Sequence, residues 1–134
     1  MRKGEAIAAP RKRCFVIAPI EEEGSEARDH SDKVLKHLVK KTLEPGPFNY
    51  NVLRADQDER PGTITSQVIK NIMDGDLVVA DLTGRNANVF YELTMCHVWQ
   101  KPTIHLCRAG ERLPFDVGQL RVIFFCYGRP RFTR

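Results

Sequence analysis

The sequence predicts an α/β fold in which helices cover both faces of a five-stranded parallel sheet. Five short apolar runs, each as long as a strand, alternate along the chain with segments of helical periodicity. The first run, at 14–18, is continuously apolar, which is typical of strands buried on both faces. The connections between the five runs are short, as in β-α-β units. We therefore expect a three-layer α/β/α sandwich with a sheet of the flavodoxin or Rossmann type.

In the first half of the chain, the first strand is expected over 14–18, a continuous apolar run closed by a proline. A polar loop is expected over 21–30. Apolar residues recur at helical spacing over 31–43, and a Pro-Gly-Pro triplet ends this helix. The strand over 50–54 is more polar than the first, so we expect it near an edge of the sheet.

In the second half, Pro61 and Thr63 open a helix, and Asp76–Asp81 is the strongest strand signal of the chain. The apolar face of that helix is formed by Ile64, Val68, Ile69, Ile72 and Met73. The remaining elements are a helix over about 88–99 with Val89, Leu93 and Cys96 on one face, a short turn or helix over 115–119, and strands over 102–107 and 121–126.

The charge of the chain is unevenly distributed. Its 134 residues carry a net charge of +4, of which residues 1–13 contribute +4 and residues 127–134 contribute +3, so the body at 14–126 has a net charge of −3. We expect one domain over 14–126 between two basic extensions. Solvated extensions are favoured over a nucleic-acid contact by these tails, because the aromatic residues do not cluster with the basic ones. No apolar run reaches the length that spans a bilayer, so no membrane partner is expected.

The cysteines Cys14, Cys96, Cys107 and Cys126 have spacings that match neither a zinc site nor a redox motif. They fall at strand-like or helical apolar positions, so we expect buried free thiols and a cytoplasmic protein. The four histidines show no metal-ligand spacing, and the sequence contains neither GxGxxG nor GxxxxGK[ST]. We expect no metal and no cofactor.

Three loops that follow predicted strands, at 19–28, 56–62 and 81–88, are rich in polar, glycine and proline residues. In sheets of this type, ligands bind beside the carboxyl ends of the strands, where the strand order reverses. These loops therefore predict a site for a small polar ligand. Asp81 ends its strand, where catalytic carboxylates of this fold often lie, and is favoured over Asp76 at the start of the same strand.

Asn88 and Glu92 are four residues apart on a predicted helix and so share one face. Glu92 is expected in about the first turn, where the helix dipole favours an ionised carboxylate. An ionised carboxylate suits a nucleophile or a stabiliser of a cation. The spacing alone nevertheless favours an ordinary surface acid at a helix start.

Ser25 and Arg28 could hold a phosphate, through a hydroxyl beside a helix start and a guanidinium fork. The alternative, a helix cap next to a solvated arginine, is favoured on the spacing alone. The acidic run Glu21–Glu23 that precedes them is interpreted as a solvated segment.

A longer motif carries a family resemblance. Residues 76–93 read Asp-Leu-Val-Val-Ala-Asp-Leu-Thr-Gly-Arg-Asn-Ala-Asn-Val-Phe-Tyr-Glu-Leu, and His97 and Lys101-Pro102 follow. This segment resembles the core of the nucleoside 2-deoxyribosyltransferase-like superfamily, and its Asn-x-Asn-Val-x-Tyr-Glu-Leu signature resembles the bacterial TIR-like branch. Weaker similarities extend the match over roughly 14–126: Phe15-Val-Ile-Ala-Pro-Ile, Gly24-Ser25-x-x-Arg28, Pro61-Gly62-x-Ile64, and Leu113-Pro-Phe-Asp with Arg121.

The resemblance implies a nucleoside or nucleotide ligand and chemistry at its N-glycosidic bond, with the family's glutamate at Glu92. In the transferases this glutamate attacks the anomeric carbon, and in related hydrolases water intercepts the oxocarbenium-like species. Asp81 is the second catalytic candidate. The resemblance also suggests a homo-oligomer. The expected substrate-binding residues are Ala18, Pro19, Ser25, Arg28, Gly62, Asn86 and Asn88.

The chain departs from the transferases at two positions. Six residues before the glutamate they carry an aspartate, where this chain has Asn86, and Asn88 replaces a glycine. An amide does not readily deliver a proton to a departing base. Either Asp81 supplies this proton, or the leaving group needs none because it is already cationic, as the nicotinamide of NAD is.

Hydrolysis of a nucleotide or dinucleotide is therefore favoured over strict transfer between bases. The main alternative is a non-catalytic nucleotide-sensing or TIR-like signalling module that uses the same pocket. A protein-interaction domain that uses the fold alone is the least favoured of the three hypotheses.

Overall fold

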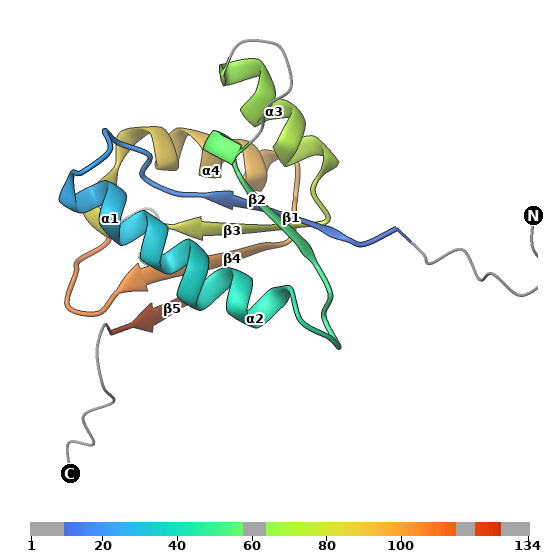
Figure 1. Cartoon of the computed structure of the whole chain (residues 1–134). Coiled ribbons are helices and arrows are strands. Elements are labelled where there is room, and N and C mark those ends of the chain that lie inside the picture. The colour runs from blue at the N-terminus through green and yellow to red at the C-terminus, as the bar shows by residue number, and fades with distance from the viewer. Residues whose placement is uncertain (1–9, 58–63, 115–119, 127–134) are drawn as a thin grey trace, which may run out of the picture.

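The computed structural model describes residues 10–57, 64–114 and 120–126 (Figure 1). Five parallel strands form one sheet in the order β2-β1-β3-β4-β5, which confirms the predicted α/β architecture. The strands are β1 (Arg13–Ile17), β2 (Asn51–Arg54), β3 (Leu77–Asp81), β4 (Thr103–Arg108) and β5 (Val122–Phe125).

Four parts of the sequence predictions lie outside the described residues. They are the ends of the basic extensions at 1–9 and 127–134, the residues 58–63 with Gly62, and the turn expected over 115–119.

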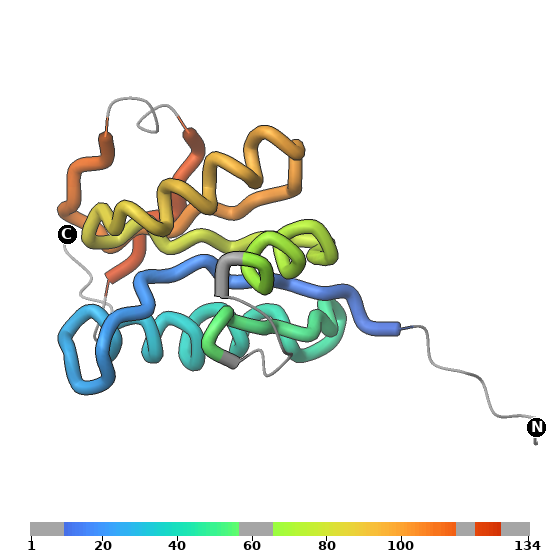
Figure 2. Tube along the Cα trace, turned by 90° about the horizontal axis from the view of Figure 1, so that it is seen from above, coloured from blue at the N-terminus to red at the C-terminus, as the bar shows by residue number. Residues whose placement is uncertain are grey.

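Helices pack on both faces of the sheet (Figures 1 and 2). One face is covered by a continuous helical stretch of α1 (Glu26–Lys33), the π-helical η1 (Val34–Lys40) and α2 (Lys41–Leu43). The other face is covered by α3 (Ile64–Asp74) and α4 (Ala87–Val98). Single 3₁₀ turns, η2 (Ala55–Gln57) and η3 (Thr83–Arg85), follow β2 and β3. Among the described residues, no helix has both the length and the apolar character needed to cross a bilayer.

The sheet separates two apolar cores. The core beneath α3 and α4 contains Val78 and Ala80 of β3, and the core beneath η1 contains Val79 of the same strand. Neighbouring residues of β3 thus point to opposite faces, as the pleat of a strand requires. The predicted stripe of α4, Val89, Leu93 and Cys96, is buried in the first of these cores.

Asp76, which directly precedes β3, links the amino end of this strand to the amino end of β1. Its carboxylate accepts a hydrogen bond from the backbone N–H of Arg13 over 2.8 Å. The backbone N–H of Asp76 donates in return to the carbonyl of Arg13 over 2.9 Å. Asp76 therefore has a structural role at the end of the sheet opposite to the predicted site.

The prediction that 50–54 forms an edge strand is confirmed by the position of β2.

Three details of the sequence prediction are wrong. The first helix begins at Glu26 rather than 31, because Ser25 caps it and its one buried residue, Ser31, is polar and so leaves no apolar periodicity. Met73, assigned to an apolar face, is 58% exposed because Val68 and Ile72 already fill the contact with the sheet. Cys126 is exposed because it follows the last residue of β5, whereas the other three cysteines are buried free thiols.

Candidate active site

A cavity of about 420 Å³ lies where the loops after β1, β2 and β3 meet the helices α3 and α4. This volume falls in the range of about 300–1,000 Å³ that is usual for small-molecule sites. The chain leaves β1 toward the face covered by α1 and leaves β3 toward the face covered by α4, so the cavity lies at the switch point of the sheet. Its lining consists of Ala18, Ile20, Ala55, Asp56, Val68, Asn86, Asn88, Tyr91, Glu92 and Met95. A smaller cavity of about 220 Å³ lies at the opposite end of the sheet, beside Arg13 and Gly75.

Asn86 fixes the start of α4. Its Oδ1 accepts hydrogen bonds from the backbone N–H groups of Asn88 over 2.9 Å and Val89 over 3.2 Å. The amide NH₂ of Asn86 is therefore the group that this side chain can offer to a ligand. An aspartate at this position would cap the helix with the same kind of oxygen. The difference from the transferase pattern thus preserves the helix start and changes only the proton chemistry.

The turn before Asn86 is held from the loop after β4. Gly84 has a φ of 81°, a left-handed conformation that suits glycine, and its backbone N–H donates to Glu111 Oε2 over 2.9 Å. Arg85 Nε donates to the carbonyl of Arg112 over 2.8 Å. These contacts fix the direction in which α4 leaves the turn and so direct Asn86, Asn88 and Glu92 toward the cavity.

Glu92 is a half-buried carboxylate in the second turn of α4, and its burial raises its pKa from the ordinary 4.5 to about 7. The expectation that the helix dipole keeps it ionised is therefore wrong. The dipole acts within the first turn, whereas Glu92 lies beyond it and shares the cavity with the apolar side chains of Val68 and Met95. The interpretation as an ordinary surface acid does not describe this position either.

Asp81 lies away from this cavity. Its side chain is fully buried on the α1 side of the sheet, where Oδ2 is 2.7 Å from Nε2 of His30 and Oδ1 accepts from the backbone N–H of Thr83 over 3.1 Å. The imidazole of His30 also stacks on the ring of Phe125, with the centroids 5.9 Å apart. The structure thus does not bring the two predicted catalytic carboxylates together, and no pattern in the sequence indicates that His30 contacts Asp81.

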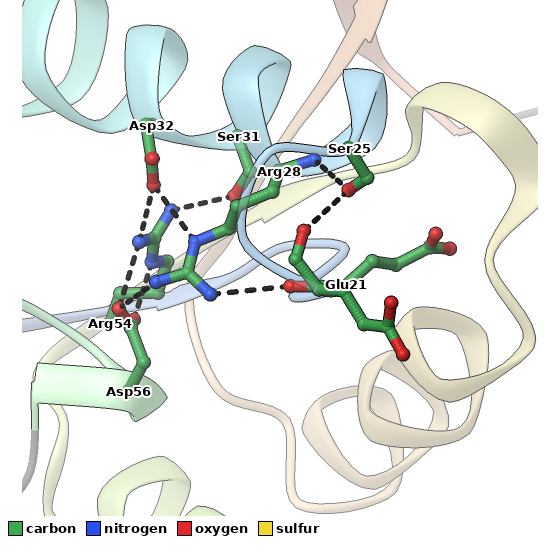
Figure 3. A network of polar contacts seen from close by, with 8 residues as sticks. Glu21, Ser25, Arg28, Ser31, Asp32, Arg54 and Asp56 are labelled. Carbon is green, nitrogen blue, oxygen red and sulfur yellow. Dashed lines mark hydrogen bonds and ion pairs between the residues drawn. The ribbon is translucent and has the colours of Figure 1, made fainter.

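Ser25 and Arg28 are both engaged in contacts within the protein (Figure 3). The Ser25 hydroxyl donates to the carbonyl of Glu22 over 2.7 Å and accepts from the backbone N–H of Arg28 over 3.1 Å, which is the helix-cap alternative. The guanidinium of Arg28 is not solvated. Its three nitrogens contact Asp32 Oδ1, the carbonyl of Glu21 and Asp56 Oδ2 at 3.1–3.2 Å. A phosphate at this point would have to displace these contacts.

Three of the other predicted binding residues, Ala18, Asn86 and Asn88, line the cavity together with Glu92. Pro19 is buried beside Ala18 and does not belong to the lining, and Gly62 lies outside the described residues. Asp56 was missed as a site residue, although it lies two residues after the end of β2 and the rule of the carboxyl ends applies to it. The remaining missed residues are apolar or aromatic and carry no chemical signal in the sequence: Ile20, Ala55, Val68, Tyr91 and Met95.

The described part of the chain contains no cluster of three or more histidine, cysteine or acidic side chains that could hold a metal ion. The polar side chains that line the cavity can instead accept and donate hydrogen bonds, and Glu92 can exchange a proton near neutral pH or attack an electrophilic carbon.

No protein-family model matches the chain, and no curated protein matches it. Solved structures do. The 2-desoxiribosyltransferase from Leishmania mexicana matches with a TM-score of 0.52 and 16% identity over 72% of this chain, which spans 64% of that enzyme's length. The Clostridium botulinum CMP N-glycosidase BcmB matches with a TM-score of 0.54 and 18% identity over 88% of this chain and 91% of its own. At these identities the similarity is one of fold, and it supports the expected α/β architecture.

Proposed function

We propose that this protein cleaves the N-glycosidic bond between base and sugar in a nucleoside or nucleotide, with Glu92 as the carboxylate that acts at the anomeric carbon. One observation carries the proposal: a half-buried glutamate with a pKa of about 7 lines a cavity of about 420 Å³ at the switch point of the sheet. The fold supports it, because the two structural neighbours are named for sugar transfer and for N-glycosidic cleavage.

The proposed reaction begins with the ionised form of Glu92. One carboxylate oxygen attacks the anomeric carbon, the carbon–nitrogen bond breaks, and the base departs with the electron pair of that bond. Water then attacks the same carbon and loses a proton to the solvent, and the ester bond breaks with its electron pair on Glu92. If the base leaves before attack, the carboxylate stabilises the oxocarbenium-like sugar instead. Because a pKa of about 7 leaves much of Glu92 ionised at neutral pH but poorly solvated, the group suits either role.

The departing base receives little help from the described residues. Asn86 cannot readily protonate it, and Asp81 is buried on the other side of the sheet. We therefore propose hydrolysis rather than transfer, and substrates whose base leaves without protonation, among them NAD with its cationic nicotinamide. Ala18, Asn86 and Asn88 line the cavity and are proposed to contact the substrate.

The alternative is a nucleotide-binding module without turnover, as in a TIR-like signalling protein. It is favoured by the amide of Asn86 in the cavity lining, since a pocket with an amide in place of the transferase aspartate can hold a nucleoside without protonating its base. The two functions differ in whether a free base is released.

We further propose that copies of the chain associate through the outer face of α4. Tyr91, Val98 and Trp99 on or just after this helix are 64%, 72% and 41% exposed, and exposed apolar side chains that lie together often mark an interaction surface. Light scattering of the wild type beside Val98→Glu tests this proposal: a mass that falls on substitution supports association, and a monomeric wild type contradicts it.

Four free cysteines are consistent with the proposed cytoplasmic location, where thiols stay reduced.

The test of the proposed function is chromatography of the purified protein after incubation with nucleosides, nucleoside monophosphates, their 2′-deoxy forms and NAD. Glu92→Gln removes the nucleophile while keeping the side-chain shape, and Glu23→Gln is the matched control because Glu23 is exposed outside the cavity. We expect wild type and the control to release a free base and Glu92→Gln to release none. Binding without release would favour the sensing module, and neither binding nor release would contradict both.

A further inference from the structure

Two arginines hold Asp56 at the wall of the cavity (Figure 3). Arg54 donates from Nε to Asp56 Oδ1 and, over 2.9 Å, from Nη2 to Asp56 Oδ2. Arg28 Nη2 donates to the same Oδ2 over 3.1 Å. Arg54 is itself only 3% exposed and also donates to Ser31 Oγ over 2.8 Å and to Asp32 Oδ1 over 2.7 Å. The carboxylate of Asp56 is therefore fixed in position before any ligand arrives.

The same contacts fix the charge of Asp56. Burial acts to raise its pKa, but the hydrogen bonds and charges of Arg54, together with the charge of Arg28, outweigh burial and lower it below the ordinary 3.8. At neutral pH Asp56 is ionised, and an ionised carboxylate only accepts hydrogen bonds. Its side chain is 22% exposed and belongs to the lining of the cavity.

Among the residues that the structure describes at this wall, the network leaves no excess of positive charge. The charges of Arg28 and Arg54 are matched by those of Asp32 and Asp56, which are in contact with both. A phosphate placed here would face the carboxylate of Asp56 without a free guanidinium edge. The group of a ligand that meets this wall must instead be a hydrogen-bond donor, such as a hydroxyl.

Asp56 follows β2, whereas Glu92 lies on α4, and both line the same cavity. A substrate whose anomeric carbon faces Glu92 carries its sugar hydroxyls one or two bonds from that carbon. We infer that Asp56 is the sugar-recognition residue of this pocket, which accepts a hydrogen bond from the 2′ or 3′ hydroxyl of the substrate. This inference rests on the proposed function and deepens it, because it makes the sugar hydroxyls, rather than a phosphate, the group that this wall selects.

The test compares binding of AMP, CMP, GMP and UMP with that of their 2′-deoxy and 3′-deoxy forms by calorimetry. A hydrogen bond to a charged acceptor is lost with one of the deoxy forms, so the wild type should bind that form roughly 10–100-fold more weakly. Asp56→Ala removes the acceptor and should bring this ratio close to one. Asp56→Asn keeps an uncharged oxygen and a similar shape, and should reduce the ratio only in part.

Asp32→Ala is the matched control. Asp32 contacts the same two arginines as Asp56, but its side chain is 52% exposed and does not line the cavity. This variant should keep the wild-type ratio even if it weakens the network. Asp56→Asn serves as the binding variant if Asp56→Ala does not fold, and the wild-type ratio is itself a test that needs no substitution.

The outcomes separate this inference from the proposed function. A wild type that binds nucleotides with no preference among their sugars would overturn the role of Asp56 and leave the proposed function standing. An equal change of the ratio in the Asp32 and Asp56 variants would overturn it as well, because the effect would belong to the network. A wild type that binds neither these nucleotides nor NAD would overturn both.

Discussion

Replacement of Glu92 by glutamine should remove a pH-dependent loss of stability that the wild type carries. Burial raises the pKa of Glu92 from 4.5 to about 7 in the folded protein. Below pH 4.5 the carboxyl group is protonated whether the chain is folded or unfolded. Between pH 4.5 and 7 the unfolded chain releases this proton first, so the free energy of unfolding falls as the pH rises. Above pH 7 both states are ionised and the loss is complete.

The size of this loss follows from the shift. A rise from 4.5 to about 7 at 1.36 kcal/mol for each pKa unit gives about 3 kcal/mol as an upper bound. Glu92 is only half-buried and water screens part of the effect, so we expect about 1–3 kcal/mol. A domain is typically stable by about 5–15 kcal/mol, so a change of this size is measurable.

The assay is urea unfolding of wild type, Glu92→Gln and Glu23→Gln at intervals between pH 4.5 and pH 8.5. The stability of Glu92→Gln relative to wild type should increase as the pH rises to about 7 and then stay constant. Glu23→Gln, which alters an exposed loop residue, should run parallel to wild type. A difference between Glu92→Gln and wild type that is independent of pH would show that Glu92 is well solvated. The case for a poorly solvated nucleophile would then fail.

Three further predictions follow from the same geometry. The initial rate of base release should rise with pH through about 7, because only ionised Glu92 attacks; a rate that falls over this range would contradict that role. Asn86→Asp should keep the cap of α4, whereas Asn86→Ala should cost about 1 kcal/mol in thermal unfolding; equal losses would contradict the capping role. Cys126 should react with a thiol reagent in the folded protein. Burial raises the pKa of the Cys14 thiol to about 12 and that of the Cys96 and Cys107 thiols to about 11. These three buried thiols should therefore react only after unfolding.

The strands could be predicted from the sequence because they bury apolar side chains, whereas the start of α1 could not because it buries a polar one. A buried strand has an apolar run as its signature, and β1 and β3 both have one. The first turns of α1 instead bury Ser31 against the guanidinium of Arg54, a contact between residues 23 positions apart. Such a polar contact leaves no periodicity in the sequence.

The position of Glu92 could be predicted from its motif, but its ionisation could not. The residues that share its cavity come from other elements, as Val68 of α3 does, and the sequence does not state which helices meet. Taken alone, α4 therefore predicts an ionised carboxylate, because the helix dipole is the only influence that this helix itself exerts on Glu92. The desolvation that raises the pKa of Glu92 depends on side chains of other elements, which only the folded structure brings around it.

The contrast between Asp81 and Asp56 shows what the rule of the carboxyl ends omits. Both residues lie at such an end, yet only Asp56 lines the cavity. On β3, Asp81 is in phase with Val79, which packs beneath η1, and out of phase with Val78 and Ala80, which pack beneath α4. Side chains alternate along a strand, so the residue that faces α4 cannot also be the residue that faces α1. The rule identifies the correct edge of the sheet, and the phase of the strand decides which face of that edge each carboxylate reaches.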